Sequence, residues 1–169
     1  MAESGCVWKY GDDVNTDVIF PGKYTYTISD PAEMAEHALE DLDPQFAGSV
    51  EEGDIIVAGR NWGCGSSREQ AVTCLKSAGV AAVIVRSCAR IYYRNAINNG
   101  LPVIVSDQIV TSLDAGEQVT LDLDGGQVIT TEGAFDLPGL PDSVLKIVES
   151  GGLLPYARKR LQEQHAYIS

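Results

Sequence analysis

The chain has 169 residues, of which 44% are hydrophobic and 21% are charged, and its net charge is −12. This length suits one domain with a hydrophobic core, so we expect a single domain over residues 1–169. The negative charge argues against nucleic acid and anionic membranes as partners, because both repel an acidic protein. No apolar run reaches the length of a membrane span and no apolar secretion signal is seen, so we expect a cytoplasmic protein.

The four cysteines, Cys6, Cys64, Cys74 and Cys88, are far apart in the sequence. Their spacing fits neither a zinc site nor a disulfide framework, and it suits a reducing compartment. The chain also lacks the closely spaced cysteines by which a protein holds an iron–sulfur cluster. We therefore expect this chain to bind no metal and no cofactor by itself.

The first part of the sequence predicts a strand, a mixed segment and a helix. Residues 5–10 have the character of a short strand, and a turn follows at residues 11–13. Residues 14–26 mix polar and apolar side chains. Asp30 followed by Pro31 predicts a helix start, with Asp30 as the N-cap and Pro31 at the first helical position.

The centre of the chain alternates strands with helices. Residues 54–58, 80–85 and 103–105 are apolar runs of strand length. Residues 67–78 and 89–99 have the apolar spacing of helices. This alternation predicts a mostly parallel sheet of the doubly wound kind, in which ligands bind at the carboxyl ends of the strands.

The last third of the sequence differs from the centre. Residues 118–123 and 127–131 alternate between apolar and polar side chains around Asp124-Gly125-Gly126, which predicts a β-hairpin. Two further helices are expected over residues 142–149 and 154–163. The predicted fold class is therefore α/β, with a central, mostly parallel sheet and an added β-hairpin layer.

The strongest chemical signal is the run Gly63-Cys64-Gly65-Ser66-Ser67-Arg68-Glu69. Its glycines permit left-handed backbone angles and a close approach of a ligand. Because the run leads into the expected helix, free backbone N–H groups and the positive end of the helix dipole favour an anion there. Arg68 can bind a carboxylate through two parallel hydrogen bonds, and a serine hydroxyl beside it can move a proton.

A simpler interpretation of the same run is a helix cap. Ser67 with Gln70, and Ser66 with Glu69, both have the spacing of a capping box. The charge pattern favours an anion site, because residues 55–106 contain six basic residues and one acidic residue in an otherwise acidic chain. Chance clustering of surface arginines is the alternative explanation of that pattern.

Two further motifs accompany this run. Residues 12–21 read Asp-Asp-Val-Asn-Thr-Asp-Val-Ile-Phe-Pro, and residues 89–102 read Ala-Arg-Ile-Tyr-Tyr-Arg-Asn-Ala-Ile-Asn-Asn-Gly-Leu-Pro. Together the three motifs resemble the swivelling domain of the aconitase family, as found in the separate small subunits of 3-isopropylmalate dehydratases. The resemblance implies a swivelling β/β/α domain like the aconitase C-terminal domain.

The resemblance also implies that two subunits contribute different parts of the active site. A large partner subunit would hold a 4Fe–4S cluster, whose open iron acts as a Lewis acid on a small dicarboxylate substrate. The small subunit would close over that cluster. By position, Ser66 is implied as the catalytic base and Asp17 as part of the catalytic network. Ser67, Arg68 and Gly65 are implied as substrate-binding residues.

The identity of the substrate depends on the stretch after the N-terminal Pro-Gly, which contacts the variable substituent in related small subunits. Lys23 and Tyr26 are the residues implied to bind substrate there. Residues 23–28 contain no arginine, which favours the apolar branch of isopropylmalate and a role in leucine biosynthesis. Related hydro-lyases acting on homoaconitate, 2,3-dimethylmalate or citraconate are alternatives. Gln70 departs from the histidine that many members carry.

Two questions stay open at this point. Arg90 and Arg94 lie four residues apart on one face of the second central helix. They can face solvent, the large subunit or the second carboxylate of the substrate, and we favour solvent or the subunit interface. A non-catalytic anion-binding or regulatory domain is the alternative function from another class.

Overall fold

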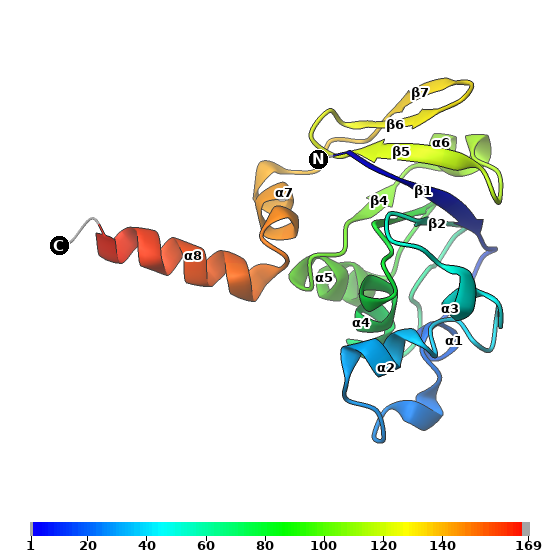
Figure 1. Cartoon of the computed structure of the whole chain (residues 1–169), viewed down its shortest axis with the longest axis horizontal. Helices are drawn as coiled ribbons and strands as arrows, with labels where there is room; N and C mark the ends of the chain where they lie inside the picture. The colour runs from blue at the N-terminus through cyan, green and yellow to red at the C-terminus, as the bar shows by residue number, and fades with distance from the viewer. Residues whose placement is uncertain (1, 167–169) are drawn as a thin grey trace.

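The structure, a computed structural model, describes residues 2–166, and a seven-stranded mixed sheet runs through it (Figure 1). The strand order is β4-β3-β2-β1-β5-β6-β7. Four neighbouring strands form a parallel half: β1 (Ala2–Lys9), β2 (Ile55–Ala58), β3 (Ala82–Val85) and β4 (Val103–Val105). Three more form an antiparallel half that pairs with β1: β5 (Gln118–Asp122), β6 (Gln127–Thr130) and β7 (Gly133–Asp136).

The central strands β2 and β3 are buried along their whole length. Their side chains alternate between two hydrophobic cores: Ile56 and Val83 contribute to one, and Ile55 and Ile84 to the other. A strand covered on both faces needs apolar residues at every position, which explains the continuous apolar runs in the sequence.

Helices cover the first face of the parallel half, and they contribute to the core that contains Ile56. They are α1 (Thr16–Ile19), α2 (Pro31–Ala35), α3 (Phe46–Ser49), α4 (Gln70–Ser77) and α5 (Arg90–Asn98). The second face is covered by α6 (Asp107–Ser112) and by inward side chains of β5 and β6. The predicted β/β/α layering with a hairpin layer is therefore confirmed.

The C-terminal helices lie at one side of this body. α7 (Asp142–Glu149) has no buried residue, and α8 (Leu153–Ala166) projects away from the rest of the chain (Figure 1). None of the helices within residues 2–166 combines the length and the apolar character needed to cross a membrane.

The expectation of a doubly wound sheet was wrong. A doubly wound sheet reverses its strand order at one point, which places helices on both faces. Here the parallel strands are added in one direction from β1 to β4. Because crossovers of one hand that step in one direction leave their helices on the same face, α4 and α5 pack into the same core.

The predicted helix start at Ser67 was wrong by three residues, because α4 begins at Gln70. Its N-cap is Glu69, without a side-chain cap bond, so neither Ser66 nor Ser67 caps the helix. Thr16 explains the late start: its hydroxyl donates to the carbonyl of Ser66, which a helix beginning at Ser67 would use to accept the Gln70 N–H.

Other local predictions were confirmed. Asp30 caps α2 by accepting a 2.7 Å hydrogen bond from the Ala32 N–H, with Pro31 at the first helical position. The hairpin of β5 and β6 lies where the alternating segments predicted it. The short elements α3, α6 and β7 were not predicted from the sequence.

Candidate active site

Residues 63–69, called here the serine loop, connect β2 to α4, and α1 holds them in place. The Thr16 N–H donates to the Cys64 carbonyl at 2.9 Å. The Thr16 hydroxyl donates to the Ser66 carbonyl, also at 2.9 Å, and Thr16 is buried. The motif at residues 12–21 is therefore the frame that fixes the serine loop.

The glycines of the loop have the left-handed angles that the sequence predicted. Gly63 has φ +70° and Gly65 has φ +93°. A Cβ atom on Gly63 would lie 2.2 Å from Cγ of Tyr92, well inside van der Waals contact. Only glycine therefore allows the loop to pass this close to α5.

Arg68 is held on two sides. Its Nη2 lies 2.7 Å from Oδ1 of Asp17, and its Nη1 donates to the Thr25 hydroxyl at 2.7 Å. The Arg68 side chain is only 21% exposed. Its remaining N–H groups have no partner among the described residues, so the guanidinium is oriented and still has donors for a carboxylate.

A cavity of about 400 Å³ lies beside the serine loop. The residues on its walls come from α1, the serine loop and the start of α5: Thr16, Gly63, Gly65, Ser66, Ser67, Arg68, Ala89, Arg90, Ile91, Tyr92 and Asn95. Ser66 and Ser67 are exposed, so a small molecule can reach them in the free chain. The cavity thus brings together two serines and an oriented arginine, as the sequence predicted.

The helix start at this cavity belongs to α5 and not to α4. Ala89 is the N-cap of α5 and gives no side-chain cap bond, and it lies on the cavity wall with Arg90 and Ile91. The Ala89 N–H donates to the Trp62 carbonyl at 2.9 Å, which ties the helix start to the residue before the serine loop. The positive end of the α5 dipole therefore replaces the α4 dipole that the sequence suggested.

Lys23 and Tyr26, the two residues implied to contact the substrate substituent, are not on the cavity wall. The Lys23 ammonium lies 2.7 Å from Oε1 of Glu40, and Tyr26 is 98% exposed. Partial burial raises the pKa of Glu40, but hydrogen bonds from Lys23 and His37 outweigh it and hold that pKa below its ordinary value. In the free chain, Lys23 is thus engaged elsewhere.

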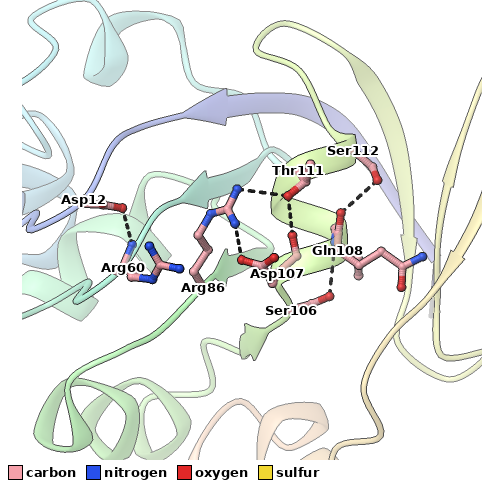
Figure 2. A network of polar contacts seen from close by, with 9 residues as sticks. Asp12, Arg60, Arg86, Ser106, Asp107, Gln108, Thr111 and Ser112 are labelled. Atoms are coloured by element: carbon pink, nitrogen blue, oxygen red, sulfur yellow. Dashed lines mark hydrogen bonds and ion pairs between the residues drawn. The ribbon is translucent and has the colours of Figure 1, made fainter.

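The six basic residues between positions 55 and 106 do not form one site. Figure 2 shows the Arg86 side chain bonded to Asp107 and Thr111 of α6, and the backbone N–H of Arg60 bonded to the Asp12 side chain at 2.6 Å. The Lys76 ammonium donates to the Gly151 carbonyl at 2.9 Å. Of the six basic residues, Arg68 and Arg90 line the cavity.

The cysteines do not fit an iron–sulfur cluster. All four are free thiols, and they lie on β1, in the serine loop, on α4 and after β3. Burial raises the pKa of Cys88 to about 12 and also raises the pKa of Cys74, so both thiols stay protonated. Among the described residues, no group of three or more His, Cys, Asp or Glu side chains could hold a metal ion.

Sequence reasoning did not single out Thr16 and Thr25. It favoured solvent or the subunit interface for Arg90, which lies on the cavity wall. Thr16 stands beside Asp17 in the N-terminal motif, which was a signal that could have found it. Thr25 has no local signal, because its partner Arg68 is 43 residues away in the sequence.

The fold and this cavity are those of an α/β domain of the aconitase C-terminal type, and comparison with known proteins agrees. The family model described as the aconitase C-terminal domain matches residues 15–108. The chain therefore belongs to the aconitase family.

The most similar known proteins show to which group within the aconitase family the chain belongs. The chain is 44% identical over 163 residues to a 3-isopropylmalate dehydratase small subunit of Thermodesulfovibrio yellowstonii, covering 95% of this chain and 96% of that protein. It is 47% identical over 161 residues to 3-isopropylmalate dehydratase small subunit 2 of Archaeoglobus fulgidus, covering 94% and 96%. A crystal structure of 3-isopropylmalate dehydratase from Methanocaldococcus jannaschii has a TM-score of 0.91 and 42% identity, covering 99% of both chains. Within the aconitase family, the chain belongs with the 3-isopropylmalate dehydratase small subunits.

Proposed function

We propose that this chain, paired with a large subunit that carries a 4Fe–4S cluster, interconverts 2-isopropylmalate and 3-isopropylmalate by dehydration and rehydration in leucine biosynthesis. The observation that carries the proposal is the single cavity on which Ser66, Ser67 and Arg68 meet. The names of the near full-length relatives support the same substrate and a large partner subunit.

In this proposal Arg68 binds one carboxylate of the substrate. Its guanidinium is fixed by Asp17 and Thr25, and its N–H groups without a partner in residues 2–166 suit two parallel hydrogen bonds to a carboxylate. Ser66 lines the same cavity as Arg68, so a substrate held by Arg68 can present to it the carbon next to the bound carboxylate. Asp17 acts through Arg68, and Gly65 allows the substrate to approach the backbone.

Ser66, as its alkoxide, then removes the proton from the carbon next to that carboxylate. The C–H electron pair forms the double bond as the neighbouring hydroxyl leaves with the electrons of its C–O bond, and the Ser67 hydroxyl donates a hydrogen bond to the substrate. A serine hydroxyl is a weak base, so its alkoxide needs strong local stabilisation. Arg68, Arg90 and the first turn of α5 place positive charge around the cavity, which favours the alkoxide once water is excluded.

The large subunit completes the site. When bound there, the cluster supplies the Lewis acid that polarises the substrate hydroxyl. Docking of the large subunit over the cavity covers Ser66 and Ser67, which are exposed in the free chain, and thereby excludes water. We expect this chain to move as one swivelling domain, and its four free thiols suit the cytoplasm.

The test is reconstitution with the large subunit, followed by assays on isopropylmalate, homoaconitate, 2,3-dimethylmalate and citraconate. We expect the highest kcat/KM with isopropylmalate. A preference for another of these diacids would replace the substrate assignment but keep the hydro-lyase. A pair without turnover on any of them would favour the regulatory alternative.

A variant tests the role of the serine. Ser66→Ala should lower kcat roughly 10²- to 10⁴-fold, because the base is lost while the fold is kept. Ser77→Ala is the matched control, since Ser77 is an exposed serine at the end of α4, outside the cavity. Retained turnover in Ser66→Ala would remove Ser66 from the mechanism.

A further inference from the structure

A second hollow opens beside the cavity, between α5 and the end of β4. It measures about 430 Å³ and carries two basic side chains, so it is named here the arginine hollow. Its walls include Cys88, Arg90, Tyr93, Arg94, Ile97 and Val105. Arg90 lines both spaces, so the arginine hollow and the cavity adjoin at this residue.

The place of the arginine hollow in the sheet points to the large subunit as its occupant. The serine loop follows β2, and Val105 is the last residue of β4. Because the carboxyl ends of parallel strands meet at one edge of a sheet, the cavity and the arginine hollow lie at the same edge. Resting on the proposed function, we propose that the arginine hollow is the docking site for an acidic segment of the large subunit, and that Arg94 binds a carboxylate of that segment.

The area of a stable interface requires contacts beyond the cavity. A specific complex buries about 800 Å² on each partner, which corresponds to about 20–30 residues a side. Eleven residues line the cavity, and Tyr92 among them is buried. A large subunit that covers Ser66 and Ser67 therefore extends over neighbouring surface, and the arginine hollow is the neighbouring surface that shares a wall residue with the cavity.

Exposed apolar side chains lie at both openings. Ile91 lines the cavity and is 55% exposed, and Val105 lines the arginine hollow and is 48% exposed. Within the arginine hollow, Tyr93 and Ile97 add further apolar wall, and Tyr93 is only partly buried. Covering these side chains removes apolar surface from water, which favours association.

Arg94 determines the charge of the segment that fits. Its side chain is exposed and forms no hydrogen bond or ion pair with the other described residues, whereas Arg86 after β3 is paired with Asp107. A guanidinium that is covered without a counter-charge is strongly destabilising, so the covering surface must bring a carboxylate. The chain as a whole repels acidic segments through its net charge of −12, which directs such a segment to this basic hollow.

A second copy of this chain is the competing occupant, because it is acidic as well. The two occupants differ in the association that Arg94 controls. Sedimentation of the isolated chain and of Arg94→Glu should give the same mass. An oligomer of the isolated chain that is lost in Arg94→Glu would assign the arginine hollow to a second copy and overturn the proposal.

The decisive comparison is Arg94→Glu against Arg158→Glu in binding to the large subunit, measured without substrate so that no catalytic step contributes. Both variants replace an exposed arginine that has no partner in the described part of the chain, and both change the net charge equally. Arg158 lies on α8, which projects away from the body, and it is outside the arginine hollow (Figure 1). Arg94→Glu should raise the Kd between the subunits roughly 100-fold, because an attraction becomes a repulsion. Arg158→Glu should change that Kd less than about 3-fold, since distant exposed charges are screened. Equal Kd values for the two variants overturn the proposal.

A pair of variants at Val105 tests the sign of the charge on the segment. Val105→Glu and Val105→Lys remove the same exposed apolar side chain at the end of β4 and add opposite charges. Against an acidic segment, Val105→Glu should raise the Kd between the subunits about 10-fold more than Val105→Lys does. The same Kd for both variants, or a weaker complex with Val105→Lys, overturns the assignment of an acidic segment.

These Kd values can be separated from the chemistry of the proposed function. A wild-type pair that binds but turns over none of the diacids overturns the proposed function, while the Arg94 comparison still decides the docking site. A wild-type chain that does not bind the large subunit overturns both.

Discussion

The parallel and antiparallel halves of the sheet differ in how they are covered. β2 and β3 are buried at every position, with a hydrophobic core on each face. In contrast, β7 has no buried residue, and α7, which follows it in the chain, has none either. β1 joins the halves, since its residues 7–9 pair with β2 and its residues 2–6 pair with β5.

This difference indicates where a site can be held rigidly. The serine loop follows β2, a strand fixed on both faces. It is bonded to Thr16, and Trp62, the residue before the loop, is bonded to the N-cap of α5. The antiparallel half supplies one wall of the second core and contributes no residue to the cavity. We therefore expect substitutions to cost much in the first half and little in the second.

The largest effect should come from the same substitution made once in each half. Phe46→Ala should lower the free energy of unfolding by about 3–5 kcal/mol, because Phe46 is fully buried and lies 5.0 Å from Trp8, ring to ring. Phe135→Ala should cost about 1 kcal/mol, because Phe135 is only half-buried on β7. Urea unfolding measures both values, and equal losses would show that the halves do not differ in packing.

A smaller effect is expected at the glycine that lets the serine loop approach α5. Gly63→Ala should lower the free energy of unfolding by about 2–4 kcal/mol, from a left-handed φ and a collision with Tyr92. Gly116→Ala, with φ +80° and no atom near the new Cβ, should cost only about 1–2 kcal/mol. If both variants lose the same stability, the close approach to Tyr92 contributes nothing.

The smallest effect should come from the partly exposed ion pair between Lys23 and Glu40, in the half of the molecule that contains the cavity. Hydrogen bonds from Lys23 and His37 hold the pKa of Glu40 below its ordinary value of 4.5. A lowered carboxyl pKa adds stability above the unfolded pKa, and this stability is lost as the pH falls through the folded pKa. Glu40→Gln should therefore lower Tm at pH 7 by less than about 3 °C, and the difference should shrink as the pH falls below 4.5 and vanish once the pH is below the folded pKa. A Tm difference that persists at acid pH would mean that Glu40 acts through packing.

The sequence by itself determined the local structure and the candidate loop. Periodicity located the central strands and both halves of the hairpin, and Asp30-Pro31 located the start of α2. The three motifs identified the family and singled out Ser66 and Arg68, which do lie on one cavity. These features follow from neighbouring residues, because propensity, caps and turns are set by side chains a few positions apart.

The tertiary structure decided which side chains meet. In the folded chain the Thr16 hydroxyl bonds the Ser66 carbonyl, so α4 begins after the serine loop, and the helix start at the cavity is that of α5. The tertiary structure also placed Arg90 on the cavity wall and paired Lys23 with Glu40. Which groups a long charged side chain bonds depends on the residues that the strand order places near it. Arg68, for example, bonds Thr25, which is 43 residues away in the sequence. No local pattern encodes such distances, so the composition of the site depends on how the strands and loops are arranged in space.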